Sequence, residues 1–337
     1  MSDTQTTSSL ADRTHRVRAP AAIVAVHFVG RSAVFVLGEE AVLIVGEDGG
    51  ELRLAVHSGA ILSSDGNGQA VVTGGDDGRV VVTDANMATA AAATDDKKRW
   101  IDHVAFGPDG TLAWSAGKTA FVRNVRNETR SREVTSTVGG LAFAPKGFRL
   151  AIAHYNGATL WFPNMVEAKP DLLSWQGSHL GATFSPDGKY LMTAMQEPLL
   201  HGWRLSDRKD LRMSGYAARV RSMAWTAGGD YLATGSSDQL ILWPFKGKDG
   251  PMGKQPKMLA PYSARLDVVA AHPAHDVVAA GYADGLVLLV RISDGAEITV
   301  RKPAQAPVTA LAFSRDGRRL GFGCEDGEGG VVDLGAP

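Results

Sequence analysis

One unit of sequence recurs along almost the whole chain, and it constrains the fold more than any other feature. Its clearest copy, residues 220–245, reads VRSMAWTAGGDYLATGSSDQLILWPF. This copy contains an alternating strand, a Gly turn, a second strand that ends in small residues, an Asp turn and a third strand. Eight copies, separated by roughly 36 to 46 residues as expected of one propeller blade, begin at Ile23, Ile61, Ile101, Val138, His179, Val220, Leu266 and Val308.

The two turns inside the unit predict how its strands pair. In the first turn, FxPDG or a variant, a proline such as Pro186 sets φ and a glycine accepts positive φ without a Cβ clash. The second turn carries an aspartate whose short side chain can bond back to the backbone. Both turns join neighbouring strands, so the sheets should be antiparallel meanders. The expected turn residues are Gly110, Gly147, Gly188 and Gly317 in the first turn and Asp77, Asp238, Asp284 and Asp326 in the second.

A more polar stretch between units can supply a fourth, outer strand. We expect such strands at Glu51 to Val56, Arg132 to Ser136, Asp171 to Trp175, Lys257 to Pro261 and Glu297 to Arg301. The last unit has no stretch after it. The alternating segment Arg13 to Ala19 should therefore pair beside Val331 to Leu334 and close the ring, which removes two exposed strand edges.

The sequence thus predicts an all-β fold, a closed β-propeller with eight four-stranded antiparallel blades. Seven blades is the alternative. The units at Ile23 and Ile61 lack the FxPDG turn, and an outer strand of the second would have to come from Ala85 to Ala93. Alanine disfavours strands, so one of these units could be a decoration on the ring.

Composition sets the domain plan and excludes several function classes. With 44% apolar and 21% charged residues, residues 13–337 can form one propeller after a disordered, Ser/Thr-rich tail, 1–12. A net charge of −1 gives no overall field for nucleic acid or an anionic membrane. The single cysteine, Cys324, excludes an intrachain disulfide, and the first residues lack signal-peptide features, so we expect a cytoplasmic protein. A closed ring needs no second subunit, which predicts a monomer.

These units resemble WD40 repeats, on the strength of FSPDG at 184–188, GSSD at 235–238 and LILWP at 240–244. The terminal tryptophan survives as Trp161, Trp203 and Trp243, and no Asp follows any of them. The resemblance, to a degenerate member of that family, covers about residues 23–334. A looser propeller relative, of the quinoprotein or surface-layer type, is the alternative.

The resemblance implies a buried network of His, Ser/Thr, Asp and Trp in each blade, which this chain can build in few places. His57 fits the histidine position, whereas Trp175, Tyr216 and Tyr262 occupy it elsewhere. We expect those three aromatic side chains to be packed rather than exposed. Stability should then come from apolar packing by Phe106, Phe143, Phe184, Trp225 and Phe313, at about 1.5 to 3 kcal/mol for each fully buried side chain.

No motif for catalysis or for a cofactor is present. GxSxG, HExxH and paired Cys/His spacings are absent, so we expect neither an enzyme nor a cofactor or metal protein. Asp102 and His103 lie on an expected innermost strand and could line the central channel. A polar pair bonded to water is the simpler interpretation, and a small-ligand or metal site there is the alternative function.

The leading hypothesis is a non-catalytic scaffold for a protein or peptide partner. In propellers of the resembled type, partners commonly bind the face formed by the loops that enter each inner strand and by the second-to-third-strand turns. Exposed Trp, Tyr and Arg dominate binding hot spots. On this chain the face should collect Arg99, Trp100, Tyr155, Arg219, Arg221, Arg265, Asp267 and Tyr282.

Overall fold

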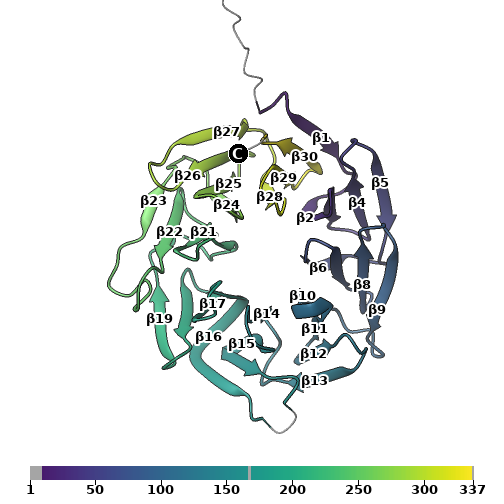
Figure 1. Ribbon diagram of the computed structural model, residues 1–337, viewed down its shortest axis with the longest axis vertical. Helices are drawn as coiled ribbons and strands as arrows, with labels where there is room; N and C mark the ends of the chain where they lie inside the picture. Colours follow the sequence, from purple (N-terminus) through teal and green to yellow (C-terminus); the bar gives the residue numbers. More distant parts are fainter. Residues whose placement is uncertain (1–9, 166–167, 336–337) are drawn as a thin grey trace, which may run out of the picture.

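The computed structural model describes residues 10–165 and 168–335. Within these ranges every element is a strand except one short 3-10 helix, Pro108–Gly110. Figure 1 shows the sheets standing around one axis, with one strand of each nearest that axis. The predicted all-β propeller with four-stranded antiparallel blades is confirmed. The predicted tail falls largely outside the described residues, and Leu10 begins a turn that leads into the first strand.

Three four-stranded sheets come first along the chain. The first contains β2 (Ile23–Val29), β3 (Ser32–Leu37), β4 (Ala41–Val45) and β5 (Glu51–Ala55). The second contains β6 (Ile61–Gly66), β7 (Ala70–Gly75), β8 (Arg79–Asp84) and β9 (Thr89–Thr94). The third contains β10 (His103–Phe106), β11 (Leu112–Ala116), β12 (Thr119–Arg123) and β13 (Thr129–Glu133).

A six-stranded sheet follows, and three four-stranded sheets complete the set. The six strands are β14 (Gly140–Phe143), β15 (Leu150–Trp161), β16 (Asp171–Phe184), β17 (Tyr190–Met195), β18 (Leu200–Arg204) and β19 (Lys209–Met213). The next two sheets are β20 (Met223–Trp225), β21 (Tyr231–Thr234), β22 (Leu240–Pro244), β23 (Lys257–Leu259), and β24 (Leu266–Ala271), β25 (Val277–Tyr282), β26 (Val287–Arg291), β27 (Glu297–Arg301). The last contains β28 (Val308–Phe313), β29 (Arg319–Cys324), β30 (Glu328–Asp333) and β1 (Thr14–Arg18).

The described residues thus form seven hydrogen-bonded sheets, not the eight that the repeat predicts. The units that start at Val138 and His179 share one sheet. β15 pairs with the first part of β16, and β17 pairs with its last part, so β16 runs unbroken from one unit into the next. Neither the unit at Ile23 nor the unit at Ile61 is a decoration on the ring, because each forms a complete four-stranded sheet. The alanine-rich segment supplies β9.

Local turn chemistry is confirmed at most of the expected positions. Gly110 and Gly317 have φ of 79° and 72°, the left-handed region that glycine enters without strain. Asp77, Asp284 and Asp326 each accept a backbone N–H two residues ahead, at 3.0, 3.1 and 3.0 Å. Four of the five expected outer strands start at the predicted residue, and β13 starts three residues early at Thr129.

Buried polar networks tie the loop before an inner strand to the second and third strands of its sheet. Where the sequence fits the family pattern, His57 Nδ1 lies 2.9 Å from Asp77 Oδ1, and His57 Nε2 lies 2.8 Å from Thr73 Oγ1. Where the histidine is replaced, Tyr216 Oη bonds Thr234 Oγ1 at 2.9 Å. At this position a tyrosine makes the contact that the family pattern gives to histidine.

The apolar residues also pack as expected between sheets. Phe184 is buried, and Phe106, Phe143, Trp225 and Phe313 are partly buried against clusters that join neighbouring sheets.

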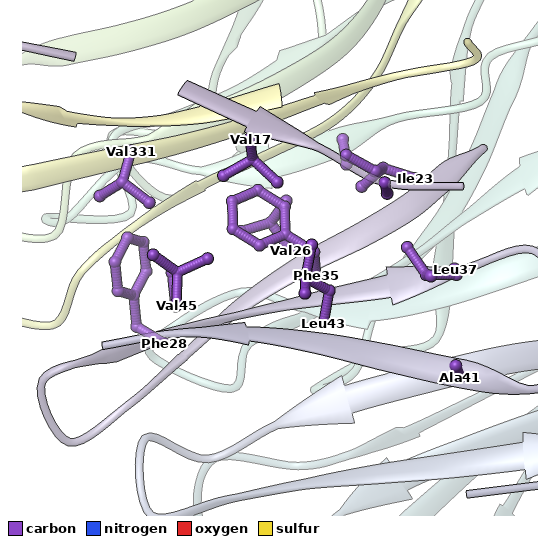
Figure 2. Packing of buried hydrophobic residues seen from close by; sticks show 13 residues of the cluster. Val17, Ile23, Val26, Phe28, Phe35, Leu37, Ala41, Leu43, Val45 and Val331 are labelled. Atoms are coloured by element: carbon purple, nitrogen blue, oxygen red, sulfur yellow. The ribbon is translucent and has the colours of Figure 1, made fainter. Parts of the chain in front are cut away.

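The first and last sheets lie side by side. β1 pairs antiparallel with β30, from Thr14 opposite Val332 to Arg18 opposite Glu328. Figure 2 shows Val17 and Val331 of the last sheet facing side chains of the first, including Phe28. The Thr309 hydroxyl donates a hydrogen bond to the Ile23 carbonyl oxygen, which joins the two inner strands. We call this boundary the seam.

Candidate functional site

The loop face comprises the loops that enter each inner strand and the turns between second and third strands. Its geometry depends on a β-bulge that recurs at the start of inner strands. The pairing with the next strand shifts register between Ile23 and Ala25, and likewise in β6, β24 and β28. A bulge re-aims the side chain of its extra residue. The residues skipped by the pairing are Val24, Leu62, Asp267 and Thr309.

Two of the bulge residues are exposed and apolar. Val24 is 45% exposed and Leu62 is 40% exposed. Trp100, in the loop that enters the next sheet, is 61% exposed. Their sheets are consecutive in Figure 1, and β6 contacts both β2 and β10. We call Val24, Leu62 and Trp100 the apolar arc; sequence reasoning found only its tryptophan, because the bulges cannot be read from a strand pattern.

Two predicted arginines are held by neighbouring carboxylates. Arg99 Nη2 lies 2.6 Å from Asp95 Oδ1 and also donates from Nε. The side-chain hydrogen bond to Asp95 raises the pKa of Arg99, so the charge is permanent. Arg265 is paired with Asp267, with Nε 2.5 Å from Oδ1. These pairs fix the conformation of their loops, and they leave fewer guanidinium N–H donors for a binding partner.

The other predicted residues are more accessible. Arg221 is exposed, and half-buried Arg219 donates to Gln196 Oε1 at 3.0 Å. Tyr155 is 55% exposed, at the bend of β15. Tyr155 belongs to the sheet that neighbours β10, whereas Arg219 and Arg221 lie between β19 and β20, across the ring from β6 in Figure 1. The structure therefore does not bring all predicted residues into one patch.

The prediction that Tyr282 is exposed was wrong. Its side chain is fully buried, its hydroxyl donates to the Ala260 carbonyl oxygen at 2.8 Å, and its ring packs 5.1 Å from that of Tyr262. Burial raises its pKa, so the phenol stays neutral. Strand alternation with buried Val278 and Ala280 was the signal that could have placed it in the core.

The expectation that the three aromatics at the histidine position are packed holds for Tyr216, which is buried. Trp175 is half-buried and stacks on His201 with centroids 4.1 Å apart. Half-buried Tyr262 donates to Asp284 Oδ2 at 2.9 Å.

Asp102 and His103 lie where β10 begins, and both are half-buried. Burial lowers the pKa of His103, and the Asp102 carboxylate partly opposes that shift. Among the residues that the structure describes, no three His, Cys, Asp or Glu side chains gather in a metal-binding arrangement. No helix in the described ranges is long and apolar enough to cross a bilayer.

The sequence analysis did not single out two polar side chains of the inner strands, His27 on β2 and Asp65 on β6. Asp65 Oδ2 accepts the Phe106 N–H at 2.7 Å, so a carboxylate joins two sheets, and burial raises its pKa. His27 Nε2 lies 2.9 Å from Ser64 Oγ, and burial lowers its pKa to about 4. Both are interior contacts that hold neighbouring sheets together.

Comparisons with known proteins agree with this geometry. The model of the family described as WD domain, G-beta repeat matches residues 209–243, from the start of β19 to Trp243 in β22. THO complex subunit 3 of Arabidopsis thaliana is 24% identical over 243 residues, 68% of this chain and 75% of the plant protein. The computationally designed Ika8 protein superposes with a TM-score of 0.76 over 94% of this chain and 97% of its own, at 18% identity, which shows the fold alone. The repeated unit, the antiparallel sheets around one axis and these matches together support a WD40-repeat β-propeller.

Proposed function

We propose that the loop face binds a protein or peptide partner and that the protein is a non-catalytic scaffold. The observation that carries this proposal is the apolar arc. Three large apolar side chains from consecutive sheets stay exposed at 40% or more, in a chain that buries most of its apolar residues. Exposed apolar side chains grouped on one face of a folded protein often mark interaction sites, and tryptophan is among the residues most enriched in hot spots.

Charged residues elsewhere on the loop face would help to orient the partner as it binds. Arg219 and Arg221 are the predicted cations least committed to carboxylates in the described structure. The paired residues Arg99, Arg265 and Asp267 and the exposed Tyr155 complete the proposed surface, from which buried Tyr282 is excluded. Rim charges steer encounter more than they add affinity, so the arc supplies most of the binding energy.

The proposal includes eight blades in a closed ring. The six-stranded sheet has enough strands for two units, because β15 bends at Asn156 (φ 67°) and pairs on both sides of the bend. Pairing of β1 with β30 supports closure through the N-terminal strand. An experimental structure at side-chain resolution, with its blades counted around the axis, tests both points.

We further propose a monomer in the cytoplasm that binds protein rather than nucleic acid. The near-neutral charge and the single buried thiol support these points. Sedimentation measures the mass of the particle. Elemental analysis of untagged protein separates this function from the alternative, a metal or small ligand at Asp102 and His103, because a scaffold carries no stoichiometric zinc or iron.

The deciding experiment compares capture of partners by the wild type and by variants of the arc. Trp100→Ala with Val24→Ser should reduce recovery of the main partner in quantitative affinity purification about tenfold or more, the scale of a hot spot. The control is Val125→Ser, which changes a 64% exposed valine in a turn on the opposite face. Equal recovery by the arc variant and the wild type, at unchanged melting temperature, would sink the proposal.

A further inference from the structure

A cavity of ≈ 850 Å³ lies at the seam, on the face opposite the loop face. We call it the seam cavity. Its lining includes the turns β2–β3 and β4–β5 of the first sheet and β28–β29 of the last, together with residues of β30, of β1 and next to β1. The volume falls within the range of about 300 to 1,000 Å³ that small-molecule sites occupy. A ligand in it would touch both sheets.

The wall of the seam cavity is well defined. Val45 and Val331, which lie near each other in Figure 2, line it and belong to the apolar cluster between the two sheets. Arg319 reaches from the last sheet to the first, where Nη1 donates to the Arg31 carbonyl oxygen at 2.6 Å and the guanidinium lies 5.2 Å from the Phe28 ring centre. Contacts across the seam therefore shape the cavity.

The lining is rich in guanidinium groups. Five arginines contribute, namely Arg13, Arg31, Arg315, Arg318 and Arg319. Arginine keeps its charge at any physiological pH and presents a fork of donors that matches phosphate oxygens. Among the described residues, Arg315 and Arg318 donate no side-chain hydrogen bond, and both are exposed at the cavity.

Four carboxylates also line the cavity, and the structure shows how they are used. Asp48, Asp316 and Asp333 accept backbone N–H groups of their own turns at 3.0, 3.1 and 2.8 Å. Glu47 pairs with Arg31 at 2.8 Å in an exposed bridge. The carboxylates are thus bound locally, whereas the two arginines of the β28–β29 turn have donors left over.

We propose that the seam cavity binds a phosphate-bearing ligand that bridges the first and last sheets. The leftover donors of Arg315 and Arg318 bind the phosphate from the last sheet, and Arg31 faces it from the first. Such a ligand binds the folded ring and not the unfolded chain, so it stabilises the fold by mass action. The site lies on the opposite face from the apolar arc and does not depend on the proposed partner.

The test measures binding and melting together. Pyrophosphate and a phosphoserine peptide, the latter with its unphosphorylated twin, are titrated separately at constant ionic strength by calorimetry and by thermal unfolding. We expect saturable binding and a higher melting temperature with at least one phosphate-bearing probe. Arg315→Ala with Arg318→Ala should weaken binding about tenfold or more, since hydrogen bonds to charged groups are lost.

The control is Arg126→Ala with Lys146→Ala, which removes two exposed cations from turns on the same face of other sheets. It should bind like the wild type. A response to pyrophosphate alone assigns a small-anion site, and a response to the phosphopeptide alone assigns a phosphoprotein site. No saturable binding of either probe, or equal weakening in the control, overturns the proposal, and neither result bears on capture of a partner by the loop face.

Discussion

The indole N–H of Trp243 donates to the hydroxyl of Tyr216 at 2.6 Å, and the same hydroxyl bonds Thr234. All three side chains are buried. Tyrosine has therefore taken over the place of a family histidine and still connects a loop to the second and third strands.

Tyr216→Phe should lower the free energy of unfolding by about 1 to 3 kcal/mol, because it leaves the buried Trp243 N–H without an acceptor. Urea unfolding followed by tryptophan fluorescence measures the loss. Tyr231→Phe is the matched control, since no hydrogen bond of its hydroxyl is recorded in the described structure. Equal effects of the two changes would contradict the role of the network.

Replacing Val17 by Asp should destabilise the fold by roughly 3 kcal/mol or more, because a charge would enter the apolar cluster at the seam without a partner. Val17 is buried against the first sheet, whereas its neighbour Arg16 is exposed. Arg16→Asp in the same strand is the control. If β1 closes the ring, only the first variant should also become sensitive to limited proteolysis near both termini.

Acid should destabilise the protein through its buried histidines. Burial lowers the pKa of His201 to about 3 and that of His27 to about 4. Below about pH 6.5 these histidines become protonated in the unfolded chain but stay neutral in the folded protein. The free energy of unfolding therefore falls as the pH falls from about 6.5 towards the lowered pKa values. Chemical unfolding at pH 8, 6 and 5 measures the slope.

His201→Phe should reduce that slope. Within the described ranges, both ring nitrogens of His201 are buried without a hydrogen-bond partner, and the ring stacks on Trp175, so an aromatic without polar atoms fits the site. At pH 8 the variant should be as stable as the wild type or more so. His15→Phe, which replaces an exposed histidine by the same residue, is the control for the substitution itself.

Cys324 should resist alkylation at pH 8 in the folded protein. The thiol is fully buried, and burial raises its pKa to about 11, so both access and thiolate are lacking. Iodoacetamide labelling followed by mass spectrometry should show modification only in denaturant. Rapid labelling of the native protein would place the thiol at the surface instead.

Local chemistry made much of the fold predictable. The turn at Gly317 and the aspartate at Asp326 depend on neighbours in sequence, and both formed as expected. The continuity of β16 and the burial of Tyr282 depend on residues that come together only after folding. The same limit applies to the site, where Trp100 was found from its type but Val24 and Leu62 are exposed by bulges whose pairing is set by the whole sheet.

The unbroken β16 also limits how the ring can move. Because β16 pairs with β15 up to Ser178 and with β17 from His179, no free loop separates the units at Val138 and His179, and rotation between them is restricted. Opening should then concentrate at boundaries that no continuous strand crosses. Backbone amides of β16 should be among the last to exchange with deuterium. Strands at the boundaries that open first should exchange first, and those boundaries should set how long the ring stays closed.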